Sequence, residues 1–147
     1  MEELTKAQKR HYRDLIGMAY ERELSAELDK LHAEFARWKA GEFDAFELEN
    51  RIHKFHQGPA RELWKSYTYP SNMTDIVLAR CVYDKAVAFH EIKPEYQADI
   101  VKRLHAFHIV RGDKTEFKIP GQGNQESAGE KKGGMEGRKR SEPEAAT

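Results

Sequence analysis

The chain has few of the features that mark secreted, disulfide-bonded or membrane proteins. It contains one cysteine, Cys81, so no disulfide can form within the 147 residues. No uncharged apolar stretch approaches the roughly 20 residues that span a bilayer. The first residues, Met1–Lys6, lack the apolar run of a secretion signal. These absences predict a soluble protein of the reducing cytoplasm that has no membrane partner.

Charge of one sign is not in excess either, because 25 Lys and Arg residues balance 25 Asp and Glu residues. A neutral chain has no overall field that attracts nucleic acid. Basic residues form two small clusters, and acidic residues flank both: Lys6, Lys9, Arg10, His11 and Arg13 near the start, and Arg138, Lys139 and Arg140 near the end. A nucleic-acid-associated regulator is therefore an alternative function that the charge pattern disfavours.

The residues from 24 to 58 indicate two helices joined by a tight turn. Apolar residues recur at steps of four and three and form one stripe: Leu24, Leu28, Leu31, Phe35 and Trp38. Gly41 ends the first helix. Asp44 is expected to cap the second, with Glu47 reaching back in a capping box and Phe43 packing on Leu48. The pattern predicts an antiparallel helical hairpin.

The first helix of this hairpin is expected to begin at the Thr5–Gln8 capping box and to run to Ala40, about 54 Å at 1.5 Å per residue. A second apolar group, Tyr12, Leu15, Ile16 and Ala19, lies about 120° around the helix from the first stripe. Gly17 stands where the face changes. We expect a kink, a break or a close helix crossing there.

The pattern predicts four helices after the first. The hairpin's second helix, 45–56, should bury Leu48, Ile52 and Phe55 and stop at Gly58 and Pro59. A short helix then places Ala60, Leu63, Trp64 and Tyr67 on one face. The most apolar helix is expected over 74–91 in the centre of the bundle, with Ile76, Tyr83, Val87, Val82, Ala86 and Phe89. The last begins at Lys93 and Pro94, fades near Gly112, and turns Tyr96, Ile100, Leu104 and Phe107 inward.

The expected fold is all-α, a small antiparallel bundle of four to five helices built on a long-helix hairpin. Residues 1–112 are expected to form the helical domain. Residues 113–147 are rich in Gly, Lys and Glu and bury too little apolar surface to fold, so we expect a disordered tail with a possible short tether at 115–119.

Histidines are the only candidates for a metal site. His53 and His56 echo His105 and His108, each pair spaced three residues apart on a helix. Two facing pairs would make a histidine metal-binding protein, a second alternative function. His53 and His105 lie about 140° around their helices from the apolar residues Leu48 and Ile100, respectively, which disfavours one shared site. A calcium loop around Gly41 is excluded because Ala36, Trp38 and Ala40 would stand at ligand positions.

No set of residues predicts catalysis. His90 falls on the stripe of the central helix, where a buried imidazole is more often neutral and hydrogen-bonded than an acid–base group. Cys81 has no adjacent base or glycine turn and is expected to be a core residue. We therefore expect no catalytic residue, no cofactor and no bound metal.

Aromatic and aliphatic residues around the hairpin predict a protein interface. The stripe offers more apolar surface than helix 45–56 covers, and Phe46 lies about 160° from Leu48. The candidate interface is Leu24, Leu28, Leu31, Phe35, Trp38 and Phe46. The sequence thus predicts a small helical protein that acts through protein–protein contacts, by self-association as a homodimer or by scaffolding a partner.

Overall fold

The computed structural model describes residues 3–112, and they are all-α, as the sequence predicts. The helices are α1 (Lys6–Lys39), α2 (Ala45–Phe55), α3 (Arg61–Tyr67), α4 (Thr74–Tyr83) and α5 (Pro94–Val110). Three short turns join them: the π-helical η1 (His56–Ala60) and the 3-10 helices η2 (Ser71–Met73) and η3 (Phe89–Glu91). The expected tail 113–147 and its tether 115–119 lie outside the described residues.

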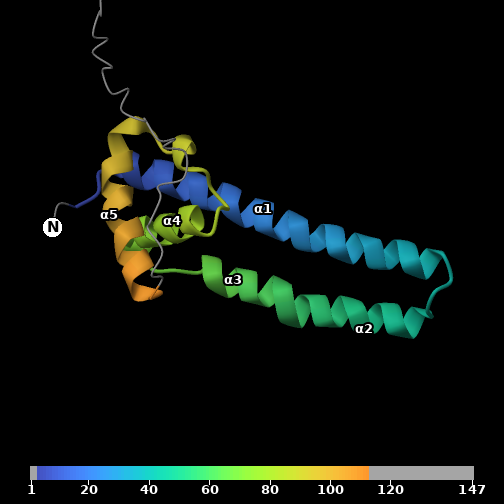
Figure 1. Cartoon of the computed structure of the whole chain (residues 1–147). Coiled ribbons are helices and arrows are strands. Elements are labelled where there is room, and N and C mark those ends of the chain that lie inside the picture. The colour runs from blue at the N-terminus through green and yellow to red at the C-terminus, as the bar shows by residue number, and fades with distance from the viewer. Residues whose placement is uncertain (1–2, 113–147) are drawn as a thin grey trace, which may run out of the picture.

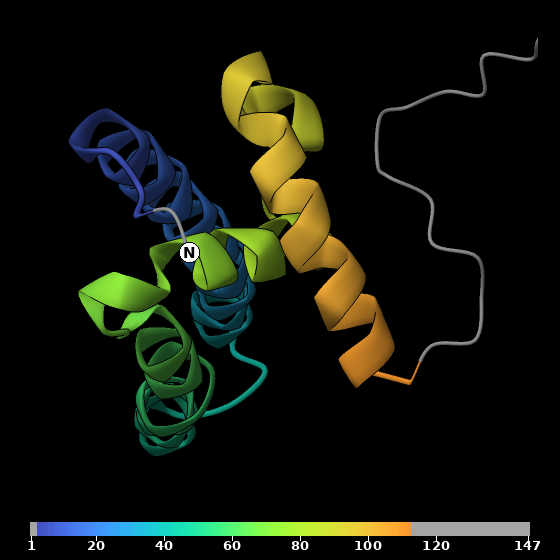
Figure 2. The same cartoon turned by 90° about the vertical axis from the view of Figure 1, so that its left-hand side faces the viewer.

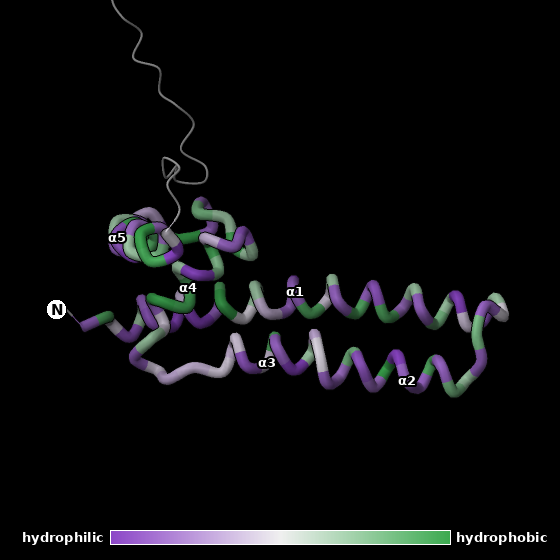
Figure 3. Tube along the Cα trace, turned by 60° about the horizontal axis from the view of Figure 1, so that its bottom comes forward, coloured by the Kyte–Doolittle hydropathy of each residue, from purple (hydrophilic) through white to green (hydrophobic). Residues whose placement is uncertain are grey.

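The helices form two parts that share α1 (Figure 1). We call α1 residues 6–19 together with α4, η3 and α5 the head. We call residues 20–67 the arm; in it α2 and α3 run antiparallel to the second half of α1 (Figure 3). Seen from the head end, α4 lies between α1 and α5 (Figure 2). The long-helix hairpin is therefore confirmed, but it projects from the bundle rather than forming its centre.

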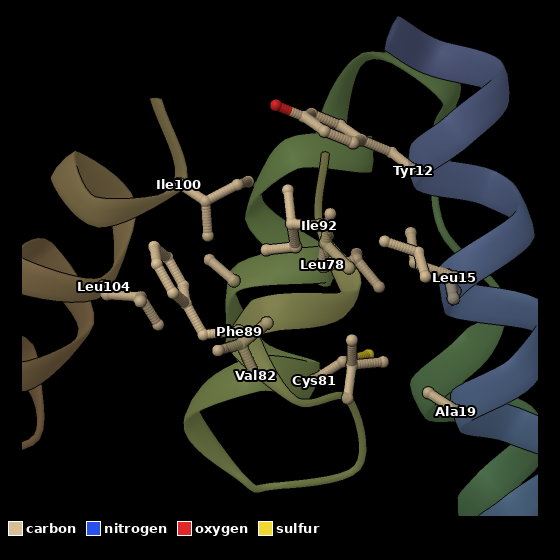
Figure 4. Packing of buried hydrophobic residues seen from close by; sticks show 14 residues of the cluster. Tyr12, Leu15, Ala19, Leu78, Cys81, Val82, Phe89, Ile92, Ile100 and Leu104 are labelled. Atoms are coloured by element: carbon tan, nitrogen blue, oxygen red, sulfur yellow. The ribbon is translucent and has the colours of Figure 1, made fainter. Parts of the chain in front are cut away.

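The buried core belongs to the head. Tyr12, Leu15 and Ala19 of α1 face Leu78 and Cys81 of α4 (Figure 4). The other side of α4 meets residues from the following loop and α5: Phe89, Ile92, Ile100 and Leu104. In the arm, by contrast, Leu48 is the one buried apolar side chain, with 5% of its surface exposed. The arm is thus a two-helix layer with little core of its own.

Helix α1 is continuous over its 34 residues, about 51 Å. The Thr5 hydroxyl accepts from the Gln8 amide at 3.1 Å and caps it, as expected. The helix runs unbroken through Gly17, and a Cβ placed there would meet nothing within 4 Å. A break and a close crossing at Gly17, two of the three expected outcomes, are therefore wrong.

Helix α2 ends at Phe55, one residue before the predicted end, but the chain does not leave the helical conformation at Gly58 and Pro59 as expected. Phe55, η1 and Arg61 all keep right-handed helical backbone angles, and Pro59 lies inside the π turn. A π turn is wider than an α turn and so leaves room for the proline ring, which has no amide to donate. Helices α2 and α3 therefore continue one another and shift register at η1.

The expected helix 74–91 is also wrong in its second half, because α4 ends at Tyr83. Lys85 adopts a left-handed conformation with φ of 64°. The Ala86 amide donates to the Cys81 carbonyl at 2.9 Å and the Lys85 amide to that of Val82 at 3.1 Å, which is a Schellman cap. The cap turns the chain so that His90 is exposed in η3, not buried on a helical stripe.

Helix α5 matches its prediction. Pro94 occupies its first turn, Ile100 and Leu104 are fully buried, and Gly112 follows the last turn with a positive φ of 66°. Tyr96 and Phe107 are half-buried at the edges of the core.

A polar cluster joins the arm to the head. The Tyr67 hydroxyl of α3 donates to Glu23 of α1 at 2.6 Å, and its ring lies 4.7 Å from that of Tyr20. The Arg80 guanidinium of α4 lies 5.0 Å from the centre of the Tyr67 ring. The pKa of Tyr67 is raised, mainly by burial and to a smaller extent by the hydrogen bond to Glu23. This cluster fixes where the arm leaves the head.

Candidate interaction surface

The arm tip is set by local backbone signals. Gly41 has φ of 80°, and the Glu42 amide donates to the Arg37 carbonyl at 3.1 Å, closing α1 with a Schellman cap. The Asp44 carboxylate accepts from the Glu47 amide at 2.9 Å and caps α2, as predicted. The reciprocal half of the box is absent, because the Glu47 carboxylate accepts instead from Arg51 at 3.0 Å.

One side of the arm is ionic. Arg51 of α2 donates to Glu34 of α1 and to Glu47, and its guanidinium lies 4.2 Å from the centre of the Phe43 ring. Arg37 lies near the same ring at 5.6 Å and pairs with Glu42. The hydrogen bond from Arg51 lowers the pKa of Glu34. The charged groups on this side already have partners within the chain.

The other side of the arm is apolar. Four side chains keep a large exposed fraction there: Leu28 with 45%, Phe35 with 38%, Ile52 with 37% and Trp64 with 59%. At about 100° per residue, Leu28 and Phe35 lie about 20° apart on α1, whereas Leu28 and Glu34 lie about 120° apart. Ile52 likewise lies about 100° around α2 from Arg51.

A groove of about 520 Å³ opens between the helices of the arm, and Trp64 lies in its wall. It is lined by Tyr20, Leu24, His56, Gln57, Ala60, Arg61 and Trp64. Leu24 lies about 40° from Leu28 on α1, and His56 lies about 40° from Ile52. Because Leu24, His56 and Trp64 line one groove, Leu28 and Ile52 flank it on the same side. We call Leu24, Leu28, Phe35, Ile52 and Trp64 the apolar flank.

The structure divides the interface that the sequence predicts. Leu28 and Phe35 are exposed on the apolar flank and Leu24 is half-buried at its groove. Leu31 and Trp38 are half-buried between the apolar and the ionic sides. Phe46 is 82% exposed but lies about 120° around α2 from Ile52, so it faces away from the flank.

Two residues of the flank, Ile52 and Trp64, are expected from the sequence on packed helix faces, and the structure leaves them exposed. Ile52 follows Leu48 at a step of four, which is the spacing of a core residue. In a two-helix arm, however, each helix has one neighbour, and a narrower stripe of its side chains is buried than in a bundle. The signal that could have indicated the exposure of Trp64 is Pro59, because the π turn that contains Pro59 rotates the helix that follows it.

The structure does not bring the four paired histidines together. His53 and His56 lie in the arm, and His105 and His108 lie on α5 in the head. Within residues 3–112, no three His, Cys, Asp or Glu side chains are placed to hold a metal ion.

Cys81 is 1% exposed, and burial raises the pKa of its thiol. The sulfur lies 3.8 Å from the Tyr67 hydroxyl. Its surroundings therefore favour the protonated thiol rather than the thiolate that reacts as a nucleophile.

A second hollow, of about 660 Å³, lies in the head beside Thr5, Gln8 and Lys102. Two of its charged groups form an ion pair, in which Arg103 donates to Asp75 at 2.8 Å. The buried Gln8 amide donates to Asp99 at 3.2 Å and to the Tyr12 hydroxyl at 2.9 Å. These polar groups are occupied in holding α1, α4 and α5 together.

The basic residues near the start of α1 are partly engaged as well. His11 accepts from the Lys93 amide at 3.1 Å, and its ring lies 5.7 Å from that of Tyr96. The second basic cluster, Arg138, Lys139 and Arg140, lies outside the described residues.

No helix within residues 3–112 is long and apolar enough to cross a membrane. Comparison of the chain with protein-family models, curated proteins and solved structures gives no match.

Proposed function

We propose that this protein acts by self-association, with the apolar flanks of two arms packed against each other. The observation that supports the proposal is the contrast between the two sides of the arm. The ionic side pairs its charges internally, whereas the apolar side leaves Leu28, Phe35, Ile52 and Trp64 in water. An exposed, contiguous apolar surface is typical of a protein interface.

A second copy of the chain suits this surface because two-helix layers pair well. One hairpin buries a single seam, but two hairpins packed face to face form a four-helix bundle in which both apolar sides are covered. The arm has one buried apolar residue, Leu48, so it has more to gain from a second layer than the head has. The proposed assembly acts in the cytoplasm through protein contacts and requires no cofactor.

Sedimentation equilibrium over a wide concentration range tests the proposal. Wild-type protein should show a reversible monomer–dimer equilibrium. Leu28→Lys should shift it to monomer, because a charge would be buried without a partner on the flank. Its helical circular dichroism should stay unchanged, since Leu28 is 45% exposed in the single chain.

Phe46→Lys is the matched control. It places the same charge on a still more exposed apolar residue that faces away from the flank, so the dimer should persist. Leu31→Lys is a poorer test, because Leu31 is half-buried between the two sides of the arm and its loss would disturb the hairpin itself. Wild-type protein that remains a monomer at the highest attainable concentration would contradict the proposed function.

A further inference from the structure

Two opposite charges bracket the apolar flank on α1. Glu21 and Lys39 are eighteen residues apart, which is about five turns at 3.6 residues per turn, so they lie on one line along the helix. Each lies about 20° from Leu28. Both are exposed, and neither has an ion-pair partner within residues 3–112; the Lys39 ammonium lies 4.8 Å from the centre of the Trp38 ring. The flank therefore ends in a negative charge toward the head and a positive charge toward the tip.

This placement distinguishes the two ways in which two arms can align. In a parallel pair, Glu21 would face Glu21 of the second copy and Lys39 would face Lys39, which places like charges together at both ends. In an antiparallel pair, each Glu21 faces a Lys39. Complementary charge at the rim of an interface selects orientation and register.

The extent of the apolar residues requires the same register. Leu24, Leu28 and Phe35 lie between Glu21 and Lys39, so two antiparallel flanks overlap most when a two-fold axis passes near position 30 of α1. That axis also brings Glu21 level with Lys39 of the second copy. Apolar overlap and charge pairing are thus satisfied together, as a self-complementary two-fold interface requires.

The head does not obstruct this arrangement. Ala19, which packs against the head core, lies about 180° around α1 from Leu28. Helices α4 and α5 therefore lie on the side of α1 opposite the flank, and α5 stands away from the arm (Figure 1). The heads of an antiparallel pair would sit at opposite ends of the joined arms.

We propose that the partner of the apolar flank is a second copy of this chain in antiparallel orientation, held in register by two Glu21–Lys39 ion pairs across a two-fold axis near position 30. The inference rests on the proposed self-association and adds its geometry.

Charge reversal tests the register. Glu21→Lys and Lys39→Glu should each weaken dimerisation roughly five- to tenfold at low salt, because each places like charges together twice per dimer. The double variant Glu21→Lys/Lys39→Glu has the net charge of the wild type and should restore its dimerisation constant. Lys54→Glu is the control, because Lys54 is exposed about 160° around α2 from Ile52 and should have no effect.

The register would be overturned if both single variants weaken the dimer and the double variant does not restore it. It would also be overturned if all three variants dimerise with the same dissociation constant as the wild type. Neither result would contradict self-association, whereas a monomeric wild type would contradict both proposals.

A distance measurement tests the orientation. Ala7 is exposed near the start of α1 and far from the flank, so Ala7→Cys accepts a spin label without touching the interface. With the axis near position 30, the two labels should be about 70 Å apart at 1.5 Å per residue. Parallel arms would bring them within about 25 Å, given interhelical distances of about 8–10 Å. Wild-type protein treated with the same label is the control, because it shows whether the buried Cys81 is labelled.

A distance near 70 Å supports the antiparallel dimer. A short distance in a protein that sediments as a dimer would overturn the inference and leave the proposed self-association intact.

Discussion

Arg22 of α1 forms a bidentate ion pair with Glu91 of η3. Nη2 donates to Oε1 at 2.6 Å and Nη1 to Oε2 at 2.9 Å. The Glu91 carboxylate also accepts from the Ala88 amide at 2.9 Å, and Arg22 donates to the Ala86 carbonyl at 3.0 Å. The pair therefore anchors the loop between α4 and α5, which supplies Val87, Phe89 and Ile92 to the core.

This anchor predicts how stability depends on pH. The hydrogen bonds from Arg22 lower the pKa of Glu91 to about 2, below the value of about 4.3 expected in an unfolded chain. Because the folded-state pKa is the lower one, the contribution is complete above about pH 4.5 and is lost as pH falls towards 2. Glu91→Gln should therefore flatten the dependence of unfolding free energy on pH in that range. Urea denaturation at several pH values measures it, and a slope equal to that of the wild type would contradict the prediction.

Gly17→Ala should stabilise the protein by about 0.5–1 kcal/mol, because Gly17 lies inside α1 with free space around its Cα. Gly41→Ala is the opposite case. Its φ of 80° disfavours any residue with a Cβ, so the same substitution should destabilise the arm by about 1 kcal/mol. Thermal unfolding of the two variants measures both changes, and changes of the same sign in the two variants would contradict the prediction.

Lys85→Gly should stabilise the head by about 1 kcal/mol, since glycine adopts the left-handed cap position without the steric cost that lysine bears. Lys85→Ala separates the effect of charge from that of backbone, because alanine removes the charge and keeps the Cβ. Equal unfolding free energies for the glycine and alanine variants would contradict the cap.

Asp44→Ala should cost about 1 kcal/mol, the usual loss when an N-cap is removed. Asp44→Asn should retain most of that stability, because the amide oxygen can still accept from the Glu47 amide. Equilibrium denaturation compares the two variants. A loss too small to resolve with alanine would mean that α2 does not depend on this cap.

Local chemistry explains which elements could be predicted from the sequence. Thr5, Gly41, Asp44 and Pro94 act within one turn of the helix end that each defines, so their signals are visible in a single stretch of chain. The end of α4 is different. Lysine has no intrinsic preference for the conformation of Lys85, and the turn forms because it returns Val87 and Phe89 to the head core.

The candidate surface was only partly predictable for a similar reason. The spacing of Leu24, Leu28 and Phe35 marks an apolar face, but it does not show how much of that face one neighbouring helix covers. That depends on the arm being a single layer of two helices, which leaves Ile52 exposed, and on the register shift at η1, which precedes Trp64 in the wall of the groove.

The central claim is that a second copy covers the apolar flank, and the most direct test is the accessibility of Trp64. Trp38→Phe leaves Trp64 as the only tryptophan, so acrylamide quenching of its fluorescence reports on the flank. Trp64 is 59% exposed in the single chain, and we predict that quenching is strong in dilute protein and falls as concentration rises, with Leu28→Lys abolishing the fall. Quenching that stays strong at concentrations where the protein sediments as a dimer would contradict the account, because the two copies would then meet elsewhere.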